Sequence, residues 1–152
     1  LALAGALFLG PRFQEATNSS RAAAMVQSAT QIARALDMRV VTTGQLIGDN
    51  QRDLLADDIL VTEGNLKSMP TNPYGLRVVL FYDPTTGDPT SLPGNRKYFV
   101  EMFLPKDDAA ASICLAAQKQ APGSATIPTL RPQAATGCFK DPEGTHRIFA
   151  RL

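Results

Sequence analysis

The sequence predicts a single α+β domain in which a long N-terminal helix is followed by antiparallel strands and a second helix. Three observations lead to this fold class. Residues 1–37 carry a helical pattern of apolar positions, residues 76–104 contain two runs of β-branched and aromatic residues, and Gly and Pro, 11 of each, concentrate after residue 44. A length of 152 residues with 44% hydrophobic residues suffices for one domain with a substantial core.

The N-terminal helix joins two unlike segments. Residues 1–11 are apolar and hold no charged side chain, and they pass without a break into an amphipathic segment, residues 12–37. We expect Gly10-Pro11 to kink or loosen the helix, because proline removes one backbone hydrogen bond. The apolar positions of the second segment recur mostly every three or four residues, as one helix face requires: Phe13, Ala16, Ala22, Met25, Val26, Ala29, Ile32, Ala33 and Leu36.

The apolar segment is too short to span a membrane alone, since a span takes about 20 apolar residues and this run ends at Arg12. No positive region precedes it and Leu-Gly-Pro is a poor cleavage site, so we do not expect a signal peptide. The first residue is not Met, and we expect the chain to begin inside a longer hydrophobic helix. Such a combination is typical of a subunit that packs an apolar rod into a larger assembly.

The region after the first helix has weaker signals. Arg39–Thr43 is rich in β-branched residues and predicts a short strand-like piece. Asn50 is a candidate N-cap for a short helix over residues 51–57. Ile59–Thr62 predicts another short strand or extended piece, and the prolines and Asn of residues 67–73 predict irregular structure.

Two strands are predicted next. Leu76–Tyr82 and Lys97–Leu104 are rich in β-branched and aromatic residues, and the Pro, Gly and Thr residues of 83–94 separate them. We expect an antiparallel hairpin with a long tip, ended by Pro105. A closing hairpin is predicted at the C-terminus, between residues 137–140 and 146–152.

A second helix is predicted over residues 108–120. Asp107 and Asp108 supply an N-cap and a favourable negative charge at its start, and Pro122-Gly123 end it. The apolar spacing places Ala110, Ile113, Cys114 and Ala117 on the inner face.

Two cysteines, Cys114 and Cys138, are present. They do not form a CxxC pair and there is one histidine, so the chain alone does not supply a Cys/His zinc site. Either they form a disulfide in an exported protein or they are buried free thiols in a cytosolic one. The apolar start and the loop-rich C-terminal third favour the disulfide. Closing a loop of about 25 residues contributes roughly 3.5 kcal/mol in the chain-entropy model.

The sequence offers little for catalysis, and we do not expect an enzyme or a bound cofactor. His146 is the single candidate base, and its turn-rich surroundings predict a surface or edge-strand histidine. The adjacent acids Asp57-Asp58 and Asp107-Asp108 diverge by about 100° on a helix, so neither pair forms an acid/base dyad. Nucleotide-binding glycine motifs are absent.

Two minority interpretations concern ions and nucleic acid. Gly48-Asp49-Asn50 with Asp53, Asp57 and Asp58 is a weak calcium candidate that lacks the Asp-x-Asp-x-Asp-Gly spacing. Arg12, Arg21, Arg34 and Arg39 lie along the first helix, where we expect a solvated or interface face rather than a DNA-contacting track. The net charge of +1 with mixed signs also argues against nucleic acid as the main partner.

Three segments, taken in order, carry a resemblance to a known family. The run from Leu3 to Gln14, with Pro11 inside it, the turn Thr-Asn-Pro-Tyr-Gly at residues 71–75, and the pair Cys114 and Cys138 resemble the apolar helix, the Asn-Pro-aromatic-Gly turn and the C-terminal disulfide of type IV pilins, most closely the type IVb group. The family's processed N-terminus, with its methylated first residue and nearby glutamate, has no counterpart here.

The resemblance implies a pilin-like α+β fold: a helix packed on an antiparallel sheet, with an N-terminal helix at residues 1–37 and a globular head at 38–152. The expected helix–sheet packing residues are Phe13, Met25, Val26, Ala29, Ile32 and Leu36. The expected filament-core residues are Leu1, Leu3, Leu7, Phe8, Leu9 and Pro11.

The function that the resemblance implies is polymerisation into a surface pilus used for adhesion, aggregation, motility or conjugative contact. The implied partners are copies of the chain itself, the inner membrane before assembly and the pilus assembly machinery, with no small-molecule substrate. The alternatives are a minor pilin or a secretion-system pseudopilin, or else a membrane-anchored periplasmic or surface binding domain.

Overall fold

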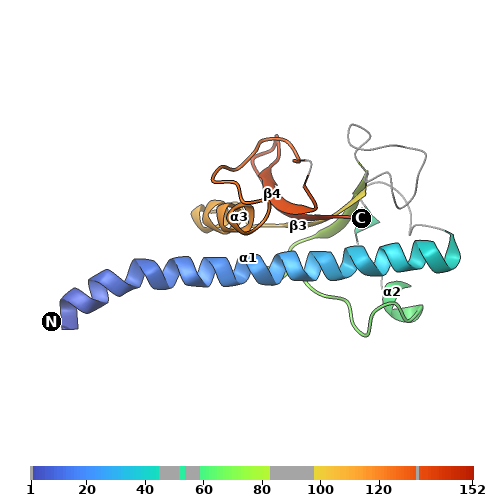
Figure 1. The fold of residues 1–152 in the computed structure, drawn as a ribbon, viewed down its shortest axis with the longest axis horizontal. Coiled ribbons are helices and arrows are strands. Elements are labelled where there is room, and N and C mark those ends of the chain that lie inside the picture. Colours follow the sequence, from blue (N-terminus) through green and yellow to red (C-terminus); the bar gives the residue numbers. More distant parts are fainter. Residues whose placement is uncertain (1, 45–51, 54–58, 83–97, 133) are drawn as a thin grey trace.

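The computed structural model describes residues 2–44, 52–53, 59–82, 98–132 and 134–152, and for residues 2–15, 52–53 and 82 it describes the backbone alone. The fold is α+β, as predicted. Figure 1 shows a long helix lying against a sheet, with a shorter helix beside it. The elements are α1 (Ala2–Thr43), β1 (Arg52–Asp53), α2 (Ile59–Thr62), β2 (Val78–Tyr82), β3 (Tyr98–Phe103), α3 (Asp108–Gln120), β4 (Thr136–Lys140) and β5 (His146–Arg151).

The sheet is antiparallel throughout, with the strand order β1-β2-β3-β5-β4. Val100 of β3 lies opposite Leu80 of β2 on one side and opposite Ala150 of β5 on the other. Both predicted hairpins are confirmed, since β2 pairs with β3 and β4 with β5. The tip of the first hairpin lies outside the described residues.

The helix α1 is continuous from Ala2 to Thr43 and passes through Gly10-Pro11. Figure 1 shows the helix bending over its first turns, which project beyond α3. The predicted end near Asp37 is wrong. The hydroxyl of Thr43 donates to the carbonyl of Arg39 at 2.7 Å, which accommodates a β-branched residue in a helix.

Residues 39–43 are therefore helical rather than strand-like. Helix α1 ends at Thr43, and the next residue, Gly44, has a φ of +74°, the left-handed conformation that glycine adopts after helix ends. The N–H of Gly44 donates to the carbonyl of Val40 at 2.8 Å.

The main core lies between α1 and one face of the sheet. Of the expected packing residues, Met25, Ala29, Ile32 and Leu36 are buried, and Val26 packs partly buried against the same cluster. The side chain of Phe13 lies outside the described set. Along β2, β3 and β5 alternate residues enter this core, as the two-residue period of a strand requires: Val78, Leu80, Val100, Met102, Ile148 and Ala150.

The segment between α1 and β2 departs from the prediction. Ile59–Thr62 forms the short helix α2 rather than an extended piece, and its Leu60 is completely buried in the core. Arg52–Asp53 pairs with β2 as a strand, so the predicted helix over 51–57 is wrong at these two residues, and its remaining residues lie outside the described set.

The helix α3 matches its predicted bounds. Asp107 is the N-cap, and its side chain accepts the N–H of Ala110 at 3.0 Å. All four predicted inner-face residues are buried: Ala110, Ile113, Cys114 and Ala117. The helix thus presents Cys114 to the core beside α1.

Candidate functional site

The projecting part of α1 is the first candidate site. Its backbone, from Ala2 to Pro11, is helical and extends past the head in Figure 1. The side chains of the expected filament-core residues lie outside the described set: Leu1, Leu3, Leu7, Phe8, Leu9 and Pro11. Within the described residues, no helix combines the length and the apolar character that crossing a membrane takes.

The arginines of α1 do not form one solvated row. Arg39 is buried, and its Nε and Nη2 donate to the carboxylate of Glu63 at 2.7 and 3.3 Å. Arg34 is exposed and pairs with Asp37 at 3.0 Å, while Arg21 is exposed. The expectation of a solvated or interface face is thus wrong for Arg39, which instead fastens α1 to the residue after α2.

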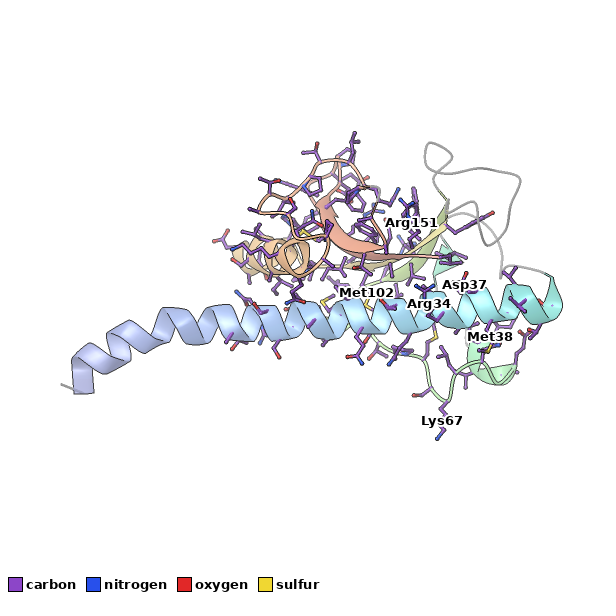
Figure 2. All side chains as sticks on the ribbon, in the orientation of Figure 1. Arg34, Asp37, Met38, Lys67, Met102 and Arg151 are labelled. Carbon is purple, nitrogen blue, oxygen red and sulfur yellow. A yellow bond between two sulfur atoms is a disulfide. The ribbon has the colours of Figure 1, made fainter. Side chains whose placement is uncertain are left out.

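A groove runs between α1 and the segment that follows α2. Its volume is about 400 Å³, and its lining is mostly polar or aliphatic: Gln27, Thr30, Gln31, Arg34, Ala35, Met38, Asn65 and Leu66. Figure 2 shows Met38 on the side of α1 that faces the segment carrying Lys67. The described lining contains no aromatic side chain, which a small-molecule site of a binding domain usually provides.

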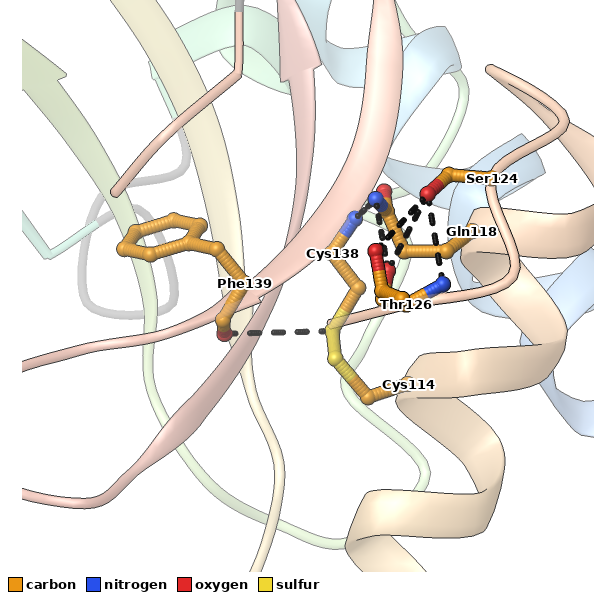
Figure 3. Close-up of a disulfide and its surroundings, with 6 residues drawn as sticks. All are labelled: Cys114, Gln118, Ser124, Thr126, Cys138 and Phe139. Atoms are coloured by element: carbon orange, nitrogen blue, oxygen red, sulfur yellow. Dashed lines mark hydrogen bonds between the residues drawn. A yellow bond between two sulfur atoms is a disulfide. The ribbon is translucent and has the colours of Figure 1, made fainter. Parts of the chain in front are cut away.

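The two cysteines are joined in a disulfide, as the sequence favoured. Cys114 and Cys138 are both fully buried, and their Cα atoms are 5.3 Å apart. Figure 3 shows the bond linking α3 to β4, the outer strand of the sheet. Gln118, one turn further along α3, accepts the N–H of Cys138 on its Oε1 at 2.8 Å. The helix and the sheet edge are therefore held by one covalent and one polar contact.

The turn at residues 71–75 is fixed by Asn72, which is buried. Its Nδ2 donates to the carbonyl of Phe103 at 2.6 Å, and its Oδ1 accepts the N–H of Tyr74 at 2.9 Å. The carbonyl of Asn72 accepts the N–H of Gly75 at 2.9 Å, which closes the turn around Pro73. The turn therefore ties the chain before β2 to the end of β3.

His146 is neither on an edge strand nor at the surface. It begins β5, which lies between β3 and β4, and its side chain is buried. Burial, together with the positive charge of Lys140, lowers the pKa of His146, and Asp141 opposes this shift.

Among the described residues, no group of three or more His, Cys, Asp or Glu side chains is placed so that it could hold a metal ion. The side chains of the weak calcium candidate, from Asp49 to Asp58, lie outside that part.

Sequence reasoning missed a buried ionic cluster on the face of the sheet away from α1. Glu101 of β3 is completely buried, and its two oxygens accept from Arg131 at 2.6 Å and Arg147 at 3.0 Å. Arg147 also donates to Asp141 at 2.8 Å. The signal that points to this cluster is a single carboxylate inside the apolar strand Tyr-Phe-Val-Glu-Met-Phe.

Neither a family model, nor a curated protein, nor a solved structure shows a significant match to this chain.

Proposed function

We propose that this chain is a structural subunit of a type IV pilus, most like the type IVb pilins, and that it polymerises through α1 into an extracellular surface filament. The observation that carries the proposal is that one continuous helix has two parts. One part packs on the sheet through Met25, Ile32 and Leu36, and the other, Ala2–Pro11, has an apolar sequence and projects beyond the head.

The physical basis is the cost of leaving the projecting segment in water. Each buried CH₂ group contributes about 0.8 kcal/mol, so a helix with leucine, phenylalanine and alanine side chains is strongly driven to pack. Copies of the same helix can cover one another side by side. A head-to-tail contact that does not close into a ring then extends into a fibre.

The same apolar segment supports the proposed route to the filament. Before assembly this segment rests in the inner membrane, and the assembly machinery transfers it to the filament core. Both surroundings cover the same apolar surface. The disulfide and the Asn72 turn support the proposal through the family resemblance, since both hold the head that would face solvent or a neighbouring subunit.

The alternative of a membrane-anchored binding domain has less support. It requires a ligand site in the head, and the groove beside α1 has a lining without aromatic side chains among the described residues. A minor pilin or a pseudopilin would share the architecture and differ in abundance and in the system it serves. Adhesion, aggregation, motility and conjugative contact are all compatible with the proposed filament.

Leu7→Lys tests the proposal, with Ala24→Lys as the matched control on the same helix. Ala24 is exposed where α1 lies along the head, so a lysine there should be tolerated. We expect electron microscopy of cells producing the native gene product to show filaments with the control and none with Leu7→Lys. Both variants should retain the melting temperature of the head. Normal filaments with Leu7→Lys, or no filaments with the unmodified protein, would overturn the proposal.

A further inference from the structure

A segment after α3 wraps around the outer strand of the sheet. We call residues 121–132 the strap. Ile127 packs against the main core, and the carbonyl of Pro128 accepts the N–H of Lys140 on β4 at 2.9 Å. Arg131 then lies among the residues of the opposite face. The strap therefore contacts both faces of the sheet and covers an N–H at its edge.

On the face of the sheet away from α1, the strap contributes the buried guanidinium of Arg131. Its Cζ atom lies 4.5 Å from the ring centroid of Phe81, 4.6 Å from that of Phe99 and 4.9 Å from that of Phe139. Its Nε and Nη2 approach the same oxygen of Glu101 at 2.7 and 2.6 Å. The Arg131 side chain is 6% exposed. Three rings and a carboxylate thus surround one planar cation, the combination that recognises guanidinium groups.

The walls of this cage come from the sheet and not from the strap. Phe81, Phe99 and Phe139 belong to β2, β3 and β4 respectively. Phe149 of β5 supports two of them by edge-to-face contacts, with ring centroids 5.9 Å from Phe99 and 6.1 Å from Phe139. Strand pairing fixes the backbone positions that carry the rings, so we expect the rings to stay close together when Arg131 is removed.

The carboxylate of the cage is also held independently. Arg147 donates to the second oxygen of Glu101 at 3.0 Å, and Asp141 holds Arg147 at 2.8 Å. The Oδ1 of Asp141 accepts the N–H of Thr145 at 2.9 Å, which fixes that acid in the turn between β4 and β5. Glu101 therefore keeps a cationic partner when Arg131 is removed, and the buried charge is not left alone.

We propose that Phe81, Phe99, Phe139 and Glu101 form a guanidinium-binding site that the chain fills with its own Arg131, and that this occupancy locks the strap over the edge of β4. An uncovered strand edge is a template for pairing with another extended segment. Filling the site in cis thus keeps the edge closed, and emptying it opens the edge while the sheet stays folded. The inference is independent of the proposed filament.

Hydrogen exchange of two amides on β4 tests the lock in Arg131→Ala. The Lys140 N–H bonds to the strap, whereas the Cys138 N–H bonds to Gln118 of α3. We expect local opening to speed exchange at Lys140 by at least about tenfold, with Cys138 and the amides of β3 nearly unchanged. Methylguanidinium at low millimolar concentration should restore slow exchange at Lys140, and methylammonium at matched ionic strength should not, because it lacks the planar fork of donors.

A second variant separates the cage from the general effect of removing a buried cation. Phe139→Leu removes one ring without changing any charge, and it should produce a smaller acceleration confined to the same amide. The proposal is overturned by uniform acceleration of all amides, by unchanged exchange at Lys140, or by equal restoration with methylammonium. Should Arg131→Ala fail to fold, Phe139→Leu decides between the local and the uniform result.

Discussion

The side-chain oxygen of Gln118 accepts the backbone N–H of Cys138 at 2.8 Å. Gln118 lies one helical turn after Cys114, the residue to which Cys138 is covalently bonded. The contact matters because β4 is the last strand of the sheet and its outward N–H groups have no neighbouring strand. A helix side chain satisfies one of them and the carbonyl of Pro128 satisfies another, at Lys140. Two N–H groups at this edge of the sheet are thereby satisfied without a further strand.

Gly137→Ala should destabilise the fold by about 1–3 kcal/mol, because the added methyl group has no room. A Cβ at this position would lie 2.5 Å from Oε1 of Gln118 and 3.1 Å from two ring carbons of Phe149. Chemical denaturation measures the loss. Adding Gln118→Ala removes the closer clash, so the double variant should lose less than the sum of the single losses. Strict additivity would contradict this account.

Replacing both cysteines, Cys114→Ala with Cys138→Ala, should lower the free energy of unfolding by about 2–5 kcal/mol. The bond closes a loop with a sequence separation of 24, and both sulfurs are buried between α3 and β4. Denaturation of the oxidised protein and the double variant gives the difference. A thiol assay on native, unreduced protein should detect no reactive thiol, and two reactive thiols would refute the bond.

Asn72→Ala should cost about 1–3 kcal/mol, because it leaves the carbonyl of Phe103 and the N–H of Tyr74 without their partner. Thermal denaturation provides the measurement. Asn72→Asp is the informative comparison, since it keeps the acceptor for Tyr74 and places a carboxylate against the Phe103 carbonyl. We expect Asn72→Asp to be at least as destabilising as Asn72→Ala at neutral pH. A milder effect would show that the bond to Phe103 is dispensable.

Because of His146, the free energy of unfolding should decrease as the pH falls below about 6.5, the ordinary pKa of histidine. Burial and Lys140 lower its pKa, so below about pH 6.5 the unfolded chain binds more protons than the folded one. The free energy of unfolding therefore decreases as the pH falls from about 6.5 to the lower pKa of His146 in the folded protein. Above about pH 6.5 this residue contributes no pH dependence. His146→Gln should remove this part of the slope in denaturation curves measured over the pH range of that decrease. An unchanged slope would show that other groups cause it.

Pro11→Ala should straighten the first helix and alter filament stability more than folding of the head. The residue lies in the projecting part of α1, and Asn18 is the first buried position among the α1 residues whose side chains the structure describes. Filament disassembly under heat or denaturant, set beside the melting temperature of the head, measures the two effects. Equal damage to both would show that Pro11 supports the head itself.

The parts of the fold that local signals determine were predictable from sequence. Asp107, Pro122 and the apolar spacing between them define α3, and the strands of both hairpins follow from β-branched and aromatic runs beside turn residues. The disulfide was favoured by the apolar start and the loop-rich C-terminal third, and the helical spacing placed Cys114 on the inner face of α3. Here local preference and tertiary packing agree.

The parts that were missed depend on contacts between distant residues. Residues 39–43 remain helical against their β-branched composition while Arg39 is held by Glu63, 24 residues later. Ile59–Thr62 is helical where Leu60 becomes buried. The ionic cluster joins Glu101 to Arg131 and Arg147, 30 and 46 positions away, and periodicity carries no information about such pairs.

The continuity of α1 has a mechanical consequence. No loop separates the projecting segment from the part buried under the sheet, and Ala22, Met25, Ala29, Ile32 and Leu36 grip the latter at successive turns. A pull on the N-terminal end would load these contacts together, as shear along the helix axis. Within α1 there is therefore no hinge about which the head could rotate relative to the projecting segment. Tension is resisted by the whole length of α1 that packs on the sheet.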